Sequence, residues 1–271
     1  MTDRDDEEKI PFTAHLEELR TRLIRCSIAV LIGTGVAYGY KEKLFDILTL
    51  PLIKALPPNG KLIYTGLPEA FFTYLKVAFI TGLLAASPVI IYQFWMFVAP
   101  GLYKKERMFL IPIIILSFFF FAGGSLFGYY IVLPVGYKFF VGFSSDTIQA
   151  MPSMKEYLGL TSKMLLAFGL VFELPIVLTG MAALGITTAD FLKKNRKYAI
   201  VLAFIIGAIL TPSPDVVSQV LMAGPLIVLY EISIIGARIF GRKPMADSED
   251  EQEAKGDDAE EEKSLKKVDP E

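Results

Sequence analysis

Residues 158–184 read LGLTSKMLLAFGLVFELPIVLTGMAAL. This stretch is almost wholly apolar, and Lys163 and Glu173 are its only charged residues. A helix needs about 20 apolar residues to cross a hydrocarbon core of about 30 Å. Backbone polar groups must be paired inside lipid, so a run of this length without alternation favours a helix over a barrel strand. We therefore expect residues 158–184 to form a membrane-spanning helix.

Similar apolar runs occur at five other places in the 271-residue chain. Hydrophobic residues make up 53% of the sequence, and their grouping into long runs argues against one or two soluble domains. The sequence therefore predicts an all-α polytopic membrane protein with six transmembrane helices. The other five runs are Leu23–Tyr40, Phe71–Val98, Met108–Leu133, Tyr198–Leu210 and Val216–Ala237.

Basic residues near the helix ends predict the orientation of the chain, because cytoplasmic loops carry an excess of Lys and Arg. One set of ends holds thirteen such residues, and the alternate set holds seven, spread over longer loops. Both termini are therefore expected in the cytoplasm. The denser set is Arg20, Arg22, Arg25, Lys104, Lys105, Arg107, Lys193, Lys194, Arg196, Lys197, Arg238, Arg242 and Lys243.

The two ends of the chain differ from its middle. Residues 1–22 are expected to be a cytoplasmic amphipathic segment, and residues 23–240 the six-helix transmembrane domain. Residues 246–271 hold 12 acids and 4 lysines and no aromatic residue, so residues 241–271 are predicted to be a disordered acidic cytoplasmic tail. Arginines precede the first apolar run, as in a signal peptide, but no A-x-A site closes it. We expect a retained first span.

The three loops on the predicted outer side differ in content. Lys41–Pro68 contains an apolar segment suited to a short helix with a kink at Pro51, and Pro134–Tyr157 also has room for a short apolar segment. Together these two loops are expected to form a cap over the outer face. The third connection, residues 211–215, is only a turn, in which Ser213 is expected to cap the next helix.

Several kinds of chemistry are excluded by missing residues. There is no G-x-x-x-x-G-K-[ST] sequence for a nucleotide, and His15 is the only histidine, so a Ser–His–Asp triad and a metal site built on several histidines are ruled out. Cys26 is the only cysteine, so no intrachain disulfide can form. We expect no catalytic residues, no metal, no cofactor and no nucleic-acid partner. The chain is predicted not to be an enzyme.

Two pairs of charged residues lie beside predicted membrane entry points on the cytoplasmic side. Glu18 and Arg20 lie in the stretch HLEELR, and Glu106 and Arg107 follow the second span. Two acids here suit a ligand with two arginines, because a planar guanidinium binds a carboxylate through two parallel charge-assisted hydrogen bonds. The alternative is that each acid pairs with a neighbouring Arg22 or Arg107, and the chemistry alone favours that alternative.

Glu173 lies near the middle of the fourth span. An ionisable group at mid-bilayer costs at least about 2.5 kcal/mol on insertion scales and is a functional hypothesis by default. Its helical neighbours Ser162, Gly169 and Gly180 form a small, partly polar face, which favours close packing or a cavity over lipid contact. Pro175 is expected to kink this helix. The alternative role for Glu173 is a structural hydrogen bond between spans.

Gln93, Asp215 and Glu231 are secondary candidates for the site, with stabilisation of a helix start as the alternative for Asp215. A proton-coupled secondary transporter with a relay of Glu173, Asp215 and Glu231 is one rival function. Such folds usually show repeats and broken helices around a midplane site, and this chain has no visible repeat. A purely structural membrane scaffold and, more weakly, a polytopic membrane enzyme are the other rivals.

Four stretches in this order resemble the TatC family, whose members are the multispan subunits of the twin-arginine protein translocase. The resemblance runs from about Thr13 to about Arg238. One departure is the pair Ser213-Pro214, which lengthens the third outer turn. The four stretches are HLEELR at 15–20, APGLYKKER at 99–107, FELP at 172–175 and LTPSPDVVSQ at 210–219.

The resemblance implies a concave scaffold that receives folded proteins whose signal peptides carry paired arginines. By similarity, Glu18 and Glu106 bind these arginines, with Arg20 and Arg107 in the same site, and Glu173 lines the concave face. The implied partners are single-span TatB- and TatA-like subunits, twin-arginine signal peptides, membrane lipid and further copies of the chain. The implied location is the bacterial plasma membrane, and export is driven by the proton-motive force.

Overall fold

The protein is helical throughout most of the part of the chain that the computed structural model describes, namely residues 12–57, 60–98, 110–144, 150–211 and 215–241. The helices in chain order are α1 Phe12–Gly39, α2 Lys41–Ile53, α3 Glu69–Val98, α4 Leu110–Phe127, the π-helical segment η3 Gly128–Val132, α5 Leu133–Val141, α6 Met154–Phe172, α7 Leu174–Ala183, α8 Ala189–Lys194, α9 Arg196–Leu210 and α10 Val216–Phe240.

Within the described residues, five helical stretches are long and apolar enough to cross a membrane. A sixth apolar helix, α9, has 15 residues and is shorter than the others. Together they account for the six runs seen in the sequence and confirm the all-α polytopic architecture. The five long stretches are His15–Gly39, Glu69–Val98, Leu110–Val141, Met154–Ala183 and Val216–Phe240.

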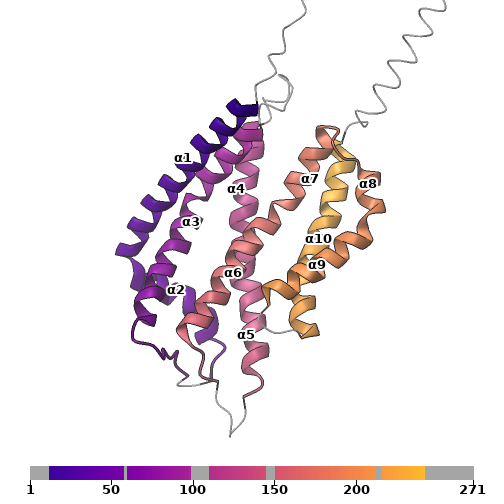
Figure 1. The fold of residues 1–271 in the computed structure, drawn as a ribbon. Helices are drawn as coiled ribbons and strands as arrows, with labels where there is room; N and C mark the ends of the chain where they lie inside the picture. Colours follow the sequence, from indigo (N-terminus) through magenta and orange to yellow (C-terminus); the bar gives the residue numbers. More distant parts are fainter. Residues whose placement is uncertain (1–11, 58–59, 99–109, 145–149, 212–214, 242–271) are drawn as a thin grey trace, which may run out of the picture.

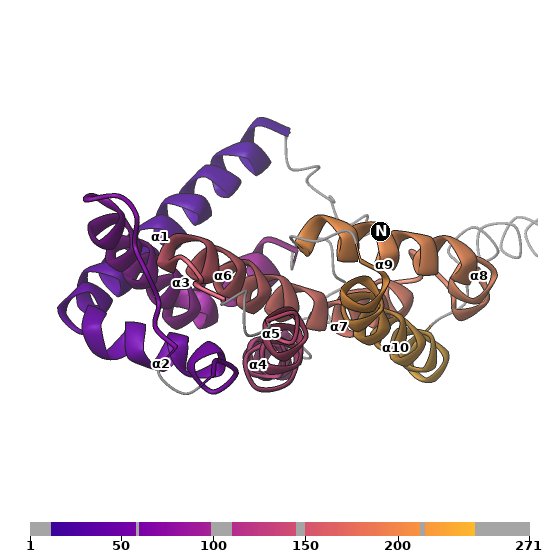
Figure 2. The same cartoon turned by 90° about the horizontal axis from the view of Figure 1, so that it is seen from below.

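The helices are arranged as a curved layer rather than a closed bundle. Figure 2 shows α1 and α3 at one edge of this layer, α9 and α10 at the other, and α6 and α7 between them. The described chain begins with α1 and ends with α10 at the same end of the molecule, and α2 lies at the opposite end (Figure 1). We call these the α1-start end and the cap end; the cap end comprises α2 and residues 54–57, 60–68 and 150–153.

The first and second loops join at the cap end, as expected from the sequence. Ile63 and Ser153 form an isolated parallel bridge. The carboxylate of Glu69 accepts hydrogen bonds from the Ser153 hydroxyl at 2.7 Å and from the backbone N–H of Lys155 at 3.1 Å. It also accepts from the backbone N–H of Thr65 at 2.9 Å. One side chain at the start of α3 therefore ties both loops together.

The expected short helix in the first loop is present as α2. Pro51 lies inside it and has no N–H to donate to the carbonyl of Ile47 one turn earlier. The hydroxyl of Tyr129 donates to that Ile47 carbonyl, and the hydroxyl of Tyr157 donates to the carbonyl of Leu48 at 2.6 Å. These two tyrosines from the spans therefore hold α2 against the helical layer.

The third span is longer than the sequence predicted. We expected it to end at Leu133 and the second loop to begin at Pro134, but the helical stretch continues to Val141. The segment Gly128–Val132 is π-helical, and only Leu133 separates it from Pro134. A proline removes one i→i−4 hydrogen bond and clashes with the preceding turn. The wider π turn accommodates both effects, so this proline does not end the helix.

The fourth span is interrupted beside Glu173, which confirms the expected kink at Pro175. Helix α6 ends at Phe172 and α7 begins at Leu174, so Glu173 lies at the junction. The start of the last helix differs from expectation. Its N-cap is Asp215, which accepts from the backbone N–H of Ser218 at 2.7 Å, so the cap that we expected at residue 213 was wrong. Residues 212–214 lie outside the described part.

The main apolar core lies toward the cap end. Its most deeply buried side chains come from η3, α6 and α3, with Leu52 contributed by α2. Burial of these apolar side chains is the main favourable contribution to packing between the helices at this end. The fully buried members include Val77, Val132, Leu158, Met164 and Phe168.

Candidate functional site

Glu18 is part of a hydrogen-bonded chain between α1 and α3 near the α1-start end. Arg22, one turn further along α1, donates through Nε to Glu18 Oε1 at 2.9 Å, and its Nη2 donates to the same oxygen. The remaining Nη1 donates to Gln93 Oε1 on α3 at 3.0 Å. Gln93 is buried, so it fixes the guanidinium from the side of the neighbouring helix.

An aromatic contact holds the same two helices together next to this chain. The rings of His15 and Phe97 are stacked, with centroids 4.3 Å apart and an interplanar angle of 20°. His15 therefore has a packing role between α1 and α3.

The Nε and Nη2 groups of Arg22 both donate to Oε1 of Glu18. The other carboxylate oxygen, Oε2, has a different environment. Within the part of the chain that the structure describes, Glu18 Oε2 accepts no hydrogen bond. The Glu18 side chain keeps 29% of its accessible surface, against 15% for Arg22. Together with Glu17, Thr21 and Arg25 they line an open hollow of about 380 Å³. The hollow presents a half-desolvated carboxylate oxygen to an N–H donor.

The structure brings only some of the predicted site residues to this hollow. Arg20 is exposed and does not line the hollow. It lies two residues after Glu18, and this spacing places its side chain on another face of the helix. Glu106 and Arg107 lie outside the described residues. Gln93, a secondary candidate, contacts the site through Arg22. The spacing of Glu18 and Arg22 at i, i+4 was the signal for their ion pair, which the sequence offered only as an alternative.

Glu173 is held by a second polar chain that joins three helices. The indole Nε1–H of Trp95 on α3 donates to Ser117 Oγ on α4 at 2.8 Å. The Ser117 hydroxyl in turn donates to Glu173 Oε2 at 2.7 Å. Glu173 Oε1 is out of reach of solvent and has no hydrogen-bond partner among the described residues.

The surroundings of Glu173 include residues of α3 and α4. Its carboxylate accepts from Ser117 on α4, and the residue itself lies at the junction of α6 and α7. The small residues on its face make room for those helices. A Cβ on Gly169 would collide with Phe121, and one on Gly180 would touch Trp95. The prediction of close packing on this face is therefore confirmed.

Each of the three acids of the rival proton relay interacts with a different partner. Glu173 binds Ser117 on α4, and Asp215 caps α10 through the backbone of Ser218. Glu231 forms an ion pair with Arg196 at the start of α9. Different partners on different helices hold these carboxylates, which disfavours a relay. The described residues also contain no group of three or more metal-ligating side chains.

One set of charged residues was not predicted to have a function from the sequence. Lys76 lies within the predicted second span, and Lys163 lies within the fourth. The rule that singled out Glu173, an ionisable side chain inside an apolar span, also applies to them. In the structure both line a hollow near the cap end, together with Lys155.

Comparisons with known proteins agree with this fold. A family model described as Sec-independent protein translocase protein (TatC) matches residues 14–225. A TatC protein of Desulforapulum autotrophicum is 62% identical over 98% of this chain and 97% of its own length. A TatC protein of Escherichia coli K12 is 36% identical over 86% of this chain and 90% of its own length.

Solved structures give the same result. A crystal structure of the twin-arginine translocase receptor TatC matches with a TM-score of 0.76 and 44% sequence identity, covering 84% of this chain and all of its own. The curved layer of apolar helices and these matches define a multi-pass membrane component of a protein translocase. The chain belongs to the TatC family.

Proposed function

We propose that this chain is the receptor subunit of a bacterial twin-arginine translocase and that the hollow at Glu18 binds one arginine of the signal peptide. The observation that carries the proposal is that Oε2 of Glu18 accepts no hydrogen bond from any described residue, while Arg22 and Gln93 hold the carboxylate in place. A carboxylate that is already oriented loses little side-chain entropy when a ligand binds.

The chemistry of the hollow suits a guanidinium. A signal-peptide arginine donates to Glu18 Oε2, while Arg22 stays on Oε1. Partial burial strengthens such a charge-assisted hydrogen bond relative to bulk water. In this proposal Glu106 supplies the acceptor for the second arginine, and Arg20 and Arg107 belong to the same site through the motifs in which they lie. A twin-arginine ligand then contacts one acid near each of the first two spans.

The proposal also includes the setting of the receptor. Both termini face the cytoplasm, an orientation supported by the excess of basic residues at those helix ends. The membrane is the bacterial plasma membrane, and the acidic residues 241–271, of which 242–271 lie outside the described part, face the cytoplasm. Single-span TatB- and TatA-like subunits and further copies of this chain are the partners, and the proton-motive force drives export.

Site-specific photo-crosslinking tests the proposal. A crosslinker at Thr21, which lines the hollow, and one at position 106 should both capture a twin-arginine precursor and fail with its twin-lysine variant. The substitutions Glu18→Ala and Glu106→Ala should each abolish capture. Asp190→Ala is the control, because it removes an exposed acid on α8 that does not line the hollow and should leave capture intact. Normal capture in both Glu18→Ala and Glu106→Ala would refute the assignment.

A further inference from the structure

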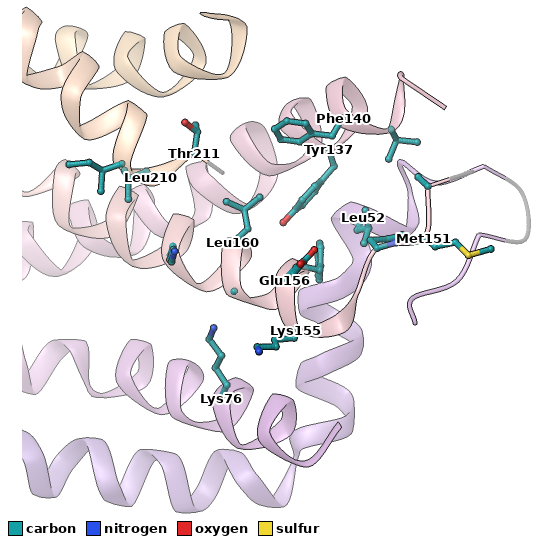
Figure 3. Close-up of a pocket in the computed structure, with 17 residues that line it drawn as sticks. Leu52, Lys76, Tyr137, Phe140, Met151, Lys155, Glu156, Leu160, Leu210 and Thr211 are labelled. Carbon is teal, nitrogen blue, oxygen red and sulfur yellow. The ribbon is translucent and has the colours of Figure 1, made fainter. Parts of the chain in front are cut away.

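A second hollow, of about 780 Å³, opens near the cap end and has no part in the proposed recognition of arginines. Figure 3 shows Lys76 extending from α3 toward the first turns of α6, where Lys155 and Glu156 lie. Lys163, two turns further along α6, also lines the hollow. Three ammonium groups from two helices therefore gather in one cavity.

A glycine at the centre of this group makes the arrangement possible. Lys155, Gly159 and Lys163 follow one another at intervals of four residues, so they share one face of α6. The Nζ of Lys76 lies 3.6 Å from the position that a Cβ on Gly159 would take. The ammonium group of Lys76 thus lies against the bare backbone of α6 between the other two lysines.

The positive charge in the hollow is not balanced within the described chain. None of the three lysines forms an ion pair there, and Glu156 is the only acid among the described lining residues. Lys76 lies seven residues beyond the start of α3, a depth of about 10 Å along the helix. Cations at such depth within a span are costly and mark a binding site or pathway by default. A bound anion offsets this cost.

The rest of the hollow is apolar. Leu52, Phe140, Leu160 and Leu210 line it from four different helices, and Figure 3 shows Leu160 on α6 between Phe140 and the lysines. A cavity with cations at one side and an aliphatic and aromatic wall at the other matches a molecule with an anionic head and an apolar chain.

We propose that this hollow binds an anionic phospholipid, with its phosphate on Lys76, Lys155 and Lys163 and one acyl chain along Leu160 and Phe140. Lysine ammonium groups act as compact point charges, which suits the rounded distribution of charge on a phosphate. Clusters of basic residues between transmembrane helices bind anionic lipid headgroups in this way. Part of the wall of the hollow is formed by membrane-spanning helices, so a lipid can reach it by lateral diffusion.

Native mass spectrometry of the purified full-length protein tests the proposal. The protein in detergent is mixed with equal amounts of phosphatidylglycerol and phosphatidylcholine of the same acyl chains. We expect phosphatidylglycerol to be retained about fivefold or more over phosphatidylcholine, the effect of about one cation near an anionic lipid surface. The triple substitution Lys76→Gln, Lys155→Gln and Lys163→Gln should abolish this preference.

Two further variants keep the test independent of folding. Lys43→Gln, Lys54→Gln and Lys138→Gln together remove the same charge from exposed positions outside the hollow and should keep the preference. Gly159→Leu fills the centre of the hollow without a change of charge and should lose it. Loss of the lipid preference in the variant with Lys43, Lys54 and Lys138 replaced would overturn the proposal. Retention of that preference in Gly159→Leu would also overturn it.

The nature of the ligand is tested separately. Inorganic phosphate at the same concentration should not displace the bound phosphatidylglycerol, because it lacks the acyl chain that contacts the apolar wall. A photo-crosslinker at Leu160 in intact membranes should yield adducts with lipid. Displacement by phosphate, or crosslinking of position 160 to a protein helix in place of lipid, would show that the occupant is not a phospholipid.

Discussion

Ser117 donates a hydrogen bond to Glu173 at 2.7 Å at the point where the fourth span is broken. The Ser117 side chain has no exposed surface, and it accepts a hydrogen bond from the indole of Trp95 as well as donating one. One hydroxyl therefore links helices α3 and α4 to the junction of α6 and α7. The position of the intramembrane carboxylate depends on this serine.

We predict that Ser117→Ala destabilises the protein by about 1–3 kcal/mol, the usual cost of leaving a buried polar group unpaired. The substitution removes the partner of Trp95 Nε1–H and the donor to Glu173 at once. Thermal unfolding in detergent measures the change. Ser27→Ala, at an exposed position on α1, is the control and should have little effect. Equal melting temperatures for the two variants would contradict the structural role of Ser117.

Transport by Glu173 variants distinguishes a hydrogen-bonding role from proton transfer. Glu173→Gln keeps an oxygen that accepts from Ser117, whereas Glu173→Ala removes the acceptor. We expect the Gln variant to transport faster than the Ala variant at equal expression. Hydrogen bonds between spans contribute roughly 1–2 kcal/mol in model membrane peptides. Equal inactivity of both variants would favour the relay, because neither side chain titrates.

The spans were predictable because long apolar runs have few structural alternatives in a membrane. The end of the third span was not, because a proline normally indicates a helix end and only the three-dimensional structure reveals the π segment before Pro134. Glu173 stood out through its depth in an apolar run, but its direction depends on Ser117, 56 residues away in sequence.

Only one of the two contacts in the hydrogen-bonded chain at Glu18 could be predicted from the sequence. The contact between Glu18 and Arg22 follows from helical spacing alone. The contact between Arg22 and Gln93 joins residues 71 positions apart and depends on how closely α1 packs on α3. Lys155, Gly159 and Lys163 share a helix face by their spacing alone, but Lys76 joins them only through packing of α3 on α6.

Gln93 is predicted to position the arginine-binding carboxylate. Gln93→Leu removes the acceptor that holds Arg22 Nη1, so Arg22 and with it Glu18 gain freedom. A hydrogen bond to a charged group contributes about 1.5–3 kcal/mol, so capture of a twin-arginine precursor should fall about ten- to a hundredfold. Gln93→Glu keeps an acceptor and should preserve capture, as should Tyr92→Phe at the adjacent exposed position. Unchanged capture with Gln93→Leu would remove Gln93 from the site.

The crossing of α1 and α3 is predicted to be intolerant of any side chain at Gly82. A Cβ at this position would lie 2.4 Å from the backbone nitrogen of Thr34, so the helices must separate. Overpacking of this kind costs about 1–3 kcal/mol. Gly35→Ala is the control, because nothing lies within 4 Å of its Cβ position and alanine favours a helix. A lower melting temperature for Gly82→Ala than for Gly35→Ala is the expected result, and the reverse order would contradict the close crossing.

The fifth span is predicted to thin the bilayer around it. Helix α9 has 15 residues, or about 22 Å at 1.5 Å per residue, against about 30 Å of hydrocarbon. Its first residue, Arg196, pairs with Glu231 on α10, which holds that end near the polar surface. The shortfall therefore lies at Thr211, where local thinning or partner helices relieve the mismatch.

Depth measurements on spin labels at Thr211 and at Phe143 test this prediction. Phe143 follows α5, which ends a helical stretch of 32 residues, so a label there should report the ordinary headgroup level of the same surface. The label at Thr211 should lie at the local polar surface and yet several ångströms closer to the bilayer centre than the label at Phe143. Equal depths would mean that α9 is tilted or displaced as a whole rather than matched by a thinner bilayer. In that case the region beside α9 and α10 would offer no thinned membrane for the entry of partner subunits.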